Sequence, residues 1–208
     1  MAESATFEVR VHGRGGQGAV TAAELLSVAA FDEGRHAQAF PSFGSERTGA
    51  PVVSFCRFSE GPIRTREPVA SPDALIVLDP TLVHQVDLFA GLRPDGYLLL
   101  SSSRRLAELG LGEVAERLRP GHALSIPARE VARRHLGKPL PNAALLGGFA
   151  ALTGQLSLPP VEAAIRERFP SPAGEANAAA AAECFELVRQ IRAESEVPDA
   201  STQERSRA

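Results

Sequence analysis

Residues 13–18 constrain the fold of this chain more than any other stretch, with the sequence Gly-Arg-Gly-Gly-Gln-Gly. A short β-like run, Phe7–Val11, comes before them, and a run rich in Ala and Leu follows to about Phe31. Glycine permits positive φ angles and lets the backbone approach a ligand closely. The N-terminus of a helix attracts anions through its free N–H groups. The stretch therefore predicts a strand, a glycine turn and a helix that together bind an anionic group.

The spacing of Gly13, Gly15 and Gly18 also fits the G-x-G-x-x-G pattern of dinucleotide-binding folds. In such folds an acidic residue at the end of the second strand, roughly 20 residues past the glycines, binds the ribose. The second strand expected here, about His36–Phe40, ends at Pro41, and the nearest acidic residues belong to the end of the first helix. The sequence therefore disfavours an NAD site. It leaves open an anion site or a turn needed only for close packing of strand and helix.

Alternation of short apolar runs with longer helical patterns predicts an α/β fold, a three-layer, mostly parallel Rossmann-like sheet with a helical C-terminal region. Continuous apolar runs are typical of parallel strands that are buried on both faces. The first helix has little polar face and should be mostly buried. The expected strands are residues 7–12, 36–40, 52–59, 74–78, 96–100 and 123–126. The expected helices are residues 18–33, 81–90, 106–117, 128–136, 143–156, 159–169 and 175–193.

An antiparallel hairpin is expected at one edge of this sheet. Val52–Ser59 is followed by a Glu-Gly-Pro turn and the strand-like Ile63–Thr65. The second strand of the chain is expected beside the first. We predict a single domain over residues 1–195, with a sheet core at about 7–127, a helical part at about 128–195, and a disordered tail over 196–208.

Composition excludes several classes of function. The net charge is −3 and no basic stripe is present, which argues against nucleic acid as a partner. No signal peptide opens the chain and no apolar run reaches the length of a membrane span, so a cytoplasmic protein is expected. Cys56 and Cys184 belong to no C-x-x-C pair and should be buried thiols, and the histidines share no short spacing. We therefore expect no metal site.

A second unusual segment, residues 41–51, reads Pro-Ser-Phe-Gly-Ser-Glu-Arg-Thr-Gly-Ala-Pro. An Arg on a glycine-containing loop is well suited to phosphate or carboxylate. Asp79 ends an expected strand, where it either caps the next helix or belongs to a site. No general base stands next to a nucleophile. The chain therefore looks more like a binding or accessory subunit than a self-sufficient enzyme.

Both segments, residues 13–18 and 41–52, closely resemble the gamma subunit of 2-oxoacid:ferredoxin oxidoreductases, whose best-known members act on pyruvate and 2-oxoisovalerate. The most specific part is 45–51, since the glycine turn alone would be shared with indolepyruvate oxidoreductases. The resemblance covers about residues 7 to 190. Further motifs match in order and spacing at 78–81, 92–96, 141–149, 162–169 and 175–177.

Two positions depart from the family pattern. Ser101–Ser103 stand where Asn is common after the fifth strand, and Ala143 stands where Thr often follows the residue that is Asn142 here. These departures concern the detail of the site and leave the resemblance intact.

The resemblance implies a subunit of an enzyme that oxidatively decarboxylates a 2-oxoacid and passes the acyl group to coenzyme A (CoA). In such enzymes thiamine diphosphate with Mg2+ lies between alpha and beta subunits. The [4Fe-4S] clusters lie in the beta subunit and a ferredoxin-like delta subunit or domain, and electrons leave to ferredoxin or a similar acceptor.

The gamma subunit would brace this assembly and help to hold the nucleotide end of CoA, without catalytic or metal-binding residues of its own. A stand-alone nucleotide- or CoA-binding module without redox partners is the alternative. The residues implied in CoA binding are Gly13, Gly15, Gly16, Gln17, Gly18, Ser42, Arg47 and Thr48.

Overall fold

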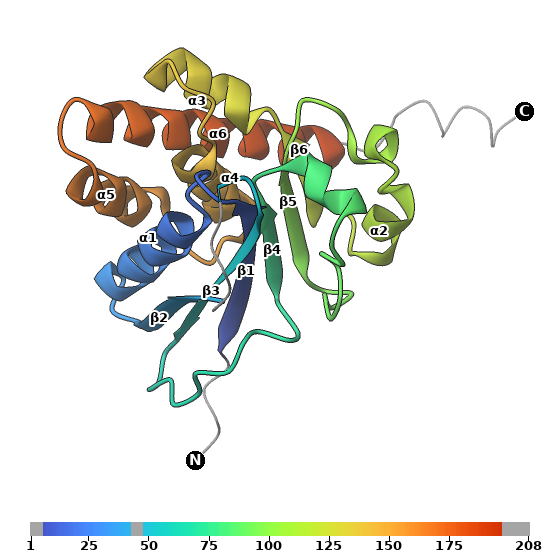
Figure 1. The fold of residues 1–208 in the computed structure, drawn as a ribbon, viewed down its shortest axis with the longest axis horizontal. Helices are drawn as coiled ribbons and strands as arrows, with labels where there is room; N and C mark the ends of the chain where they lie inside the picture. The colour runs from blue at the N-terminus through green and yellow to red at the C-terminus, as the bar shows by residue number, and fades with distance from the viewer. Residues whose placement is uncertain (1–5, 43–47, 197–208) are drawn as a thin grey trace, which may run out of the picture.

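The computed structural model describes residues 6–42 and 48–196, and its core is one mixed sheet (Figure 1). Within these residues six strands follow the order β2-β3-β1-β4-β5-β6. β1, β4, β5 and β6 are parallel neighbours, whereas β3 runs antiparallel to both β1 and β2. The strands are β1 (Phe7–Arg14), β2 (His36–Pro41), β3 (Pro51–Ser59), β4 (Ala74–Val77), β5 (Tyr97–Ser101) and β6 (Ala123–Ile126).

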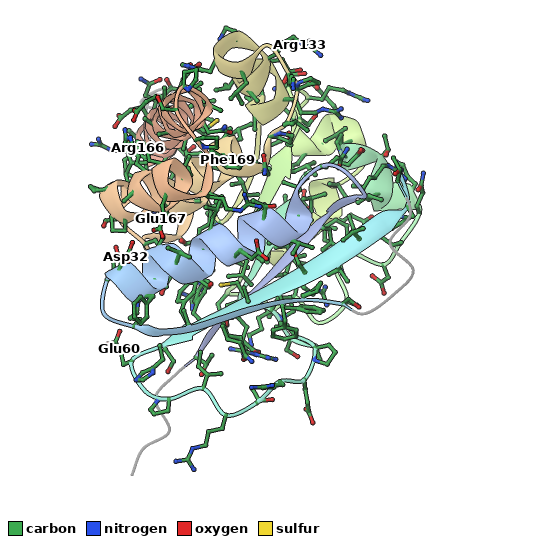
Figure 2. All side chains as sticks on the ribbon, turned by 60° about the vertical axis from the view of Figure 1, so that its left-hand side comes forward. Asp32, Glu60, Arg133, Arg166, Glu167 and Phe169 are labelled. Carbon is green, nitrogen blue, oxygen red and sulfur yellow. The ribbon has the colours of Figure 1, made fainter. Side chains whose placement is uncertain are left out.

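Helices pack on the sheet and also on one another. α1 lies across the sheet with α5 beside it, and Asp32 marks the C-terminal end of α1 (Figure 2). α4 packs against β5 and against α6, and α3 packs against α6. The helices are α1 (Ala19–Asp32), α2 (Gly112–Arg117), α3 (Ala128–Leu136), α4 (Asn142–Thr153), α5 (Leu158–Arg168) and α6 (Ala173–Glu196). Two 3₁₀ turns are η1 (Pro80–His84) and η2 (Leu106–Leu109).

Each face of the sheet has its own hydrophobic core, because successive strand residues point to opposite faces. In β4, Ile76 packs in the cluster that contains α1, α4, α5 and α6, whereas Leu75 and Val77 pack in a cluster with η1, η2 and Leu118. The predicted three-layer α/β fold with a mostly parallel sheet is therefore confirmed.

α4 is the most deeply buried helix in the described part of the chain, and two adjacent glycines explain how it fits. A Cβ atom on Gly147 would overlap the backbone carbonyl oxygen of Ala181 in α6. A Cβ atom on Gly148 would lie 2.8 Å from Cδ1 of Ile126 in β6. The two glycines therefore let α4 approach α6 on one side and the sheet on the other.

The strand pairing differs from the prediction in two ways. β2 does not lie beside β1, because β3 is inserted between them and pairs Phe58 with Phe7 and Ser59 with His36. The expected strand Ile63–Thr65 is absent from the described residues. Both hydrogen-bonding edges of β3 are already occupied, so no edge is left for it. The antiparallel edge pair exists, but β2 and β3 form it.

Several element boundaries were also wrong. The helix expected over residues 81–90 is only the turn η1, because Arg10 reaches from β1 and binds the carbonyl oxygens of Leu88 and Ala90. The helix expected over 106–117 is divided into η2 and α2 at Gly110, whose φ is +74°.

The predicted burial of side chains agrees with the structure at some positions and differs at others. α1 is less buried than expected at its end, where the Phe31 side chain is 72% exposed. Cys56 and Cys184 are buried, as predicted. α6 continues to Glu196, and the remainder of the predicted tail, 197–208, lies outside the described residues. No helix in the described part of the chain is long and apolar enough to cross a membrane.

Candidate functional site

The glycine loop, defined here as residues 13–18, lies at the carboxyl edge of the sheet where β1 ends. From β1 the chain turns toward β2 on one side of the sheet, and from β4 it turns toward β5 on the other side. In open α/β sheets ligands bind at such a switch point, outside the carboxyl ends of the two diverging strands. The switch point here lies between the glycine loop and residues 79–85.

Glycine is needed at different positions of the loop for different physical reasons. At Gly13 a Cβ atom would lie 2.9 Å from Cδ1 of Leu78, so this position serves close packing. Gly16 is exposed, with φ +94° and no atom within 4 Å of a Cβ position. Gly18 has φ +80°, and its Cβ position lies 2.5 Å from Nδ2 of Asn142. Packing therefore explains Gly13, whereas backbone conformation explains Gly16 and leaves free space beside it.

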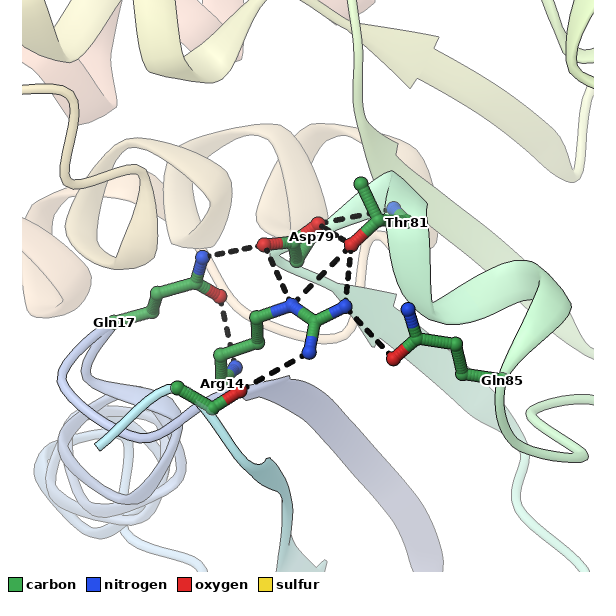
Figure 3. A network of polar contacts seen from close by, with 6 residues as sticks. Arg14, Gln17, Asp79, Thr81 and Gln85 are labelled. Carbon is green, nitrogen blue, oxygen red and sulfur yellow. Dashed lines mark hydrogen bonds and ion pairs between the residues drawn. The ribbon is translucent and has the colours of Figure 1, made fainter. Parts of the chain in front are cut away.

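Arg14 connects three segments of the chain at this edge (Figure 3). Its Nη2 donates to Oγ1 of Thr81 at 2.7 Å and to Oε1 of Gln85 at 2.9 Å, both in the segment after β4. Its Nη1 donates to the carbonyl oxygen of Gly49 at 3.0 Å, in the segment before β3. Its Nε lies 3.4 Å from Oδ2 of Asp79. Arg14 therefore fixes the position of the glycine loop relative to both neighbouring segments.

Gln17 and Asp79 complete this network. Gln17 Oε1 accepts from the backbone N–H of Arg14 at 2.8 Å, and Gln17 Nε2 donates to Asp79 Oδ2 at 2.6 Å. Asp79 Oδ1 accepts from the backbone N–H and the hydroxyl of Thr81. Asp79 therefore caps η1, which is the first of the two roles considered from the sequence, and it also belongs to this network.

The charge state of Asp79 follows from these contacts. Burial alone would raise the pKa of its carboxyl group. The hydrogen bonds from Thr81 and Gln17, together with the charge of Arg14, outweigh burial and hold the pKa below its usual value. Asp79 is therefore a carboxylate at neutral pH, and Arg14 balances its charge.

The segment before β3, which belongs to the second unusual stretch (residues 41–51), contacts the glycine loop at Gly15. The backbone N–H of Gly15 donates to the carbonyl oxygen of Ala50 at 2.9 Å, and Gly49 donates back to the carbonyl oxygen of Gly15 at 3.1 Å. Gly15 also forms an isolated β-bridge with Thr48. Ser42 lies at the other end of the loop, where its N–H donates to Val53. Thr48 therefore lies beside the glycine loop, and its part in binding stays a prediction.

Arg47, which the sequence analysis placed in the site, lies outside the described residues, as does the first part of the segment 45–51. The residues that sequence reasoning missed are Arg14, Thr81, Gln85 and Asn142. Arg14 and Asn142 each lie inside a motif quoted for the family resemblance, which was the available signal. Thr81 also lies inside such a motif, at 78–81, whereas Gln85 carried no signal beyond its position after a strand end.

His12 precedes the loop on β1 and is a buried histidine. Burial, and then the charge of Arg10, lower the pKa of His12 to about 4. Its Nε2 has no hydrogen-bond partner among the described residues. Within the same residues no group of three or more His, Cys, Asp or Glu side chains is arranged to hold a metal ion.

Comparison with known proteins assigns the chain to a family. The family model for pyruvate ferredoxin/flavodoxin oxidoreductase matches residues 8–187. The chain belongs to this family. The pyruvate/ketoisovalerate oxidoreductases common subunit gamma from Pyrococcus abyssi is 46% identical over 182 residues, which are 86% of this chain and 96% of that protein. The resemblance to gamma subunits is thereby confirmed.

Solved structures give the same result. The crystal structure of pyruvate oxidoreductase subunit PORC from Thermotoga maritima has a TM-score of 0.73 and 31% identity, and the match covers 88% of this chain and 97% of that one. A 2-oxoglutarate:ferredoxin oxidoreductase chain from Magnetococcus marinus has a TM-score of 0.67 and 16% identity, over 91% of this chain and 32% of that one. The second likeness shows the fold alone.

Proposed function

We propose that this chain is the gamma subunit of a thiamine-diphosphate-dependent 2-oxoacid:acceptor oxidoreductase. The complex would convert a 2-oxoacid, CoA and an oxidised acceptor into an acyl-CoA, CO2 and the reduced acceptor. Family membership supports the reaction class. Thiamine diphosphate, Mg2+ and [4Fe-4S] clusters belong in this proposal to the alpha, beta and delta partners, and ferredoxin or a similar protein receives the electrons.

Within that complex the glycine loop helps to bind CoA. The observation that carries this assignment is the free backbone at the start of α1. Gly16 is exposed, and α1 begins after Gly18 with no side-chain cap from the described residues and no acidic residue in its first turn. Hydrogen bonds from N–H groups to an ionised acceptor are among the stronger polar contacts in proteins. The start of α1 therefore suits a phosphate group.

The distribution of charge supports the same assignment. Asp79 is paired with Arg14 and hydrogen-bonded by Gln17, so it does not present an unbalanced negative charge to a phosphate. Gln17 uses its amide oxygen to accept from the backbone of Arg14 and its amide nitrogen to donate to Asp79, so we assign it a positioning role in the CoA site.

Isolation of the native protein distinguishes the subunit from the stand-alone alternative. A gamma subunit should co-purify in a brown complex that contains thiamine diphosphate and iron. A colourless monomer that binds CoA without partners would support the stand-alone module and contradict the subunit assignment.

The role of Arg47 is tested in the assembled complex. Replacing Arg47 with Ala should raise the apparent KM for CoA while iron and thiamine contents stay unchanged. Arg66→Ala is the matched control, because Arg66 is an exposed arginine that follows the opposite end of β3. An unchanged KM for CoA in the Arg47 variant would remove this residue from the site.

A further inference from the structure

β2 forms one edge of the sheet, and no strand lies on its outer side in the described part of the chain (Figure 1). The N–H of Ser42 donates to the carbonyl oxygen of Val53, so these two residues form a hydrogen-bonded pair between the end of β2 and β3. Hydrogen-bonded and non-hydrogen-bonded pairs alternate along an antiparallel ladder. Every second residue before Ser42 therefore bonds to β3, whereas the backbone groups of Ala37 and Ala39 point outward.

This open edge has few of the features that keep sheet edges apart. Natural edge strands are commonly very short, charged or covered by another segment. β2 has six residues and contains no Lys, Arg, Asp or Glu. Pro41 is the next outward-pointing residue, where no N–H is needed within the sheet. β6, at the other edge, has only four residues. β2 is therefore the edge that better fits pairing with a further strand.

The outward groups of β2 are complementary to those of a second copy of the same strand. When two such strands run antiparallel about a two-fold axis at Gln38, Ala37 of each copy lies opposite Ala39 of the other. Both residues direct an N–H and a carbonyl oxygen outward, so each of the two pairs can exchange two hydrogen bonds. A closed, symmetric contact of this kind is the commonest arrangement of homodimers.

Gln38 favours this register over its neighbours. Its Oε1 is buried and has no hydrogen-bond partner among the described residues, although buried polar atoms are nearly always hydrogen-bonded. In the register about Gln38, the two copies of this residue form a non-hydrogen-bonded pair with Cα atoms about 4.5 Å apart. Rotation of the two side chains then lets each amide nitrogen donate to Oε1 of the other copy.

The end of α1 adds apolar surface beside the same edge. α1 packs on β2, and the N–H of Arg35, just before β2, donates to the carbonyl oxygen of Ala30 in α1. Phe31 is 72% exposed, and it and Val28 are two of the three exposed large apolar side chains in the described part of the chain. Antiparallel pairing brings this end of α1 toward Pro41 of the second copy, so the contact has an apolar part as well.

We propose that the β2 edge is an interface between two copies of this chain, which pair antiparallel about Gln38 and join their sheets into one. The proposal goes beyond the proposed function, because it concerns how two gamma chains meet. It holds whichever ligand the glycine loop binds, so the CoA experiments and the experiments below fail independently.

The first test is sedimentation equilibrium of the purified full-length chain, which should show a concentration-dependent dimer. Ala39→Pro removes an outward N–H from each copy and should weaken the dimer tenfold or more. Ala123→Pro is the matched control on β6. His122 accepts from the N–H of Leu98 in β5, so the N–H of Ala123 points away from the sheet. This control should leave the dimer affinity unchanged.

A second variant keeps the test valid if Ala39→Pro does not fold. Gln38→Glu would place two carboxylates opposite each other across the two-fold axis, and like charges directly opposite are destabilising. The dimer should therefore weaken. The Tm of the monomer should not fall, because position 38 pairs with Arg57 in β3 and the new carboxylate lies beside a guanidinium group.

Crosslinking tests the register itself. Under mild oxidation Gln38→Cys should form a disulfide between two chains, because the two substituted positions face each other. His36→Cys should not, since the two positions would lie roughly 14 Å apart at about 3.4 Å per residue along the strand. Cys56 and Cys184 are buried, so the native thiols provide a low background.

Three results would overturn the interface. The first is a wild-type chain that remains monomeric at about 100 μM, a concentration at which even weak specific contacts form. The second is a dimer whose affinity changes with neither Ala39→Pro nor Gln38→Glu. The third is equal crosslinking of Gln38→Cys and His36→Cys. A dimer that both substitutions at the β2 edge weaken, with crosslinking only through position 38, would establish it.

Discussion

Two pairs of adjacent glycines in this molecule have opposite purposes. Gly15 and Gly16 lie in the glycine loop, where Gly16 has a positive φ and open space around it. Gly147 and Gly148 lie inside α4, with the backbone of α6 on one side and the sheet on the other. Glycine inside a helix is destabilising by about 1 kcal/mol relative to Ala. The helix pair is therefore retained for packing, whereas in the loop pair Gly16 is retained for its backbone conformation.

The largest expected effect tests the packing pair. Gly147→Ala should lower the free energy of unfolding by about 3 kcal/mol, because the new Cβ would overlap the Ala181 carbonyl and backbone atoms cannot rotate away. Urea denaturation of the purified chain measures this. Gly112→Ala is the control, since nothing lies within 4 Å of its Cβ position and its φ is not positive. Wild-type stability in the Gly147 variant would contradict the close approach of α4 and α6.

Gly18 stands between the two classes, because it has a positive φ and also a close neighbour. Gly18→Ala should lower the free energy of unfolding by about 2 kcal/mol, the sum of left-handed strain and of displacing Asn142. The neighbour is a side chain, so the effect is smaller than at Gly147. The double variant with Asn142→Ala should recover the contact part and retain the strain. A purely additive double variant would show that Asn142 does not contact this position.

The third prediction concerns the pH dependence of stability that His12, in β1 just before the loop, should cause. Above pH 6.5 His12 is neutral in the folded and the unfolded chain. Burial, and then the charge of Arg10, lower its folded pKa to about 4, so between pH 6.5 and 4 only the unfolded chain binds the proton. Stability should therefore fall as the pH falls, by at most about 1.4 kcal/mol per pH unit. Denaturation at pH 6.5 and 5.5 measures the slope, which His12→Gln should reduce. An equal slope in the variant would assign the effect to other groups.

The smallest expected effect tests the loop pair. Gly16→Ala should lower the free energy of unfolding by about 1 kcal/mol, because only left-handed strain is added and no atom is displaced. Within the assembled complex the same change should raise the KM for CoA, since the new methyl group occupies the space beside the free N–H groups. A loss of stability as large as that of Gly147→Ala would remove the distinction between the two glycine pairs.

Much of the fold could be predicted because its elements are bounded locally. β6 and α3 were predicted to the residue, since each is a short patterned run that ends at Pro or Gly. The position of β3 could not be predicted, because strand order depends on pairs such as Phe7 with Phe58, and periodicity carries no information about partners so distant. The helix expected after β4 was wrong for a related reason, since Arg10 holds that segment from another strand.

For the site too, the local segment could be predicted, whereas its long-range partners could not. The glycine loop was anticipated from its residues, and the family resemblance assigned Thr48 to the same site, although the bridge between Gly15 and Thr48 was not itself predicted. The network of Arg14 was not, because its partners Thr81 and Gln85 are separated from it by 67 and 71 positions. The closeness of Asn142 to Gly18 was not anticipated either, since only the packing of α4 against α1 reveals it.

The contact between Gly18 and Asn142 also bears on the order of synthesis. The glycine loop leaves the ribosome among the first residues, but its neighbours at Gly49, Asp79 and Gln85 follow much later, and α4 later still. A nascent chain therefore carries an unfinished loop until residue 142 and the helix that follows have emerged. The contacts around the loop are completed only after most of the chain has been made, so incomplete translation products should lack this arrangement.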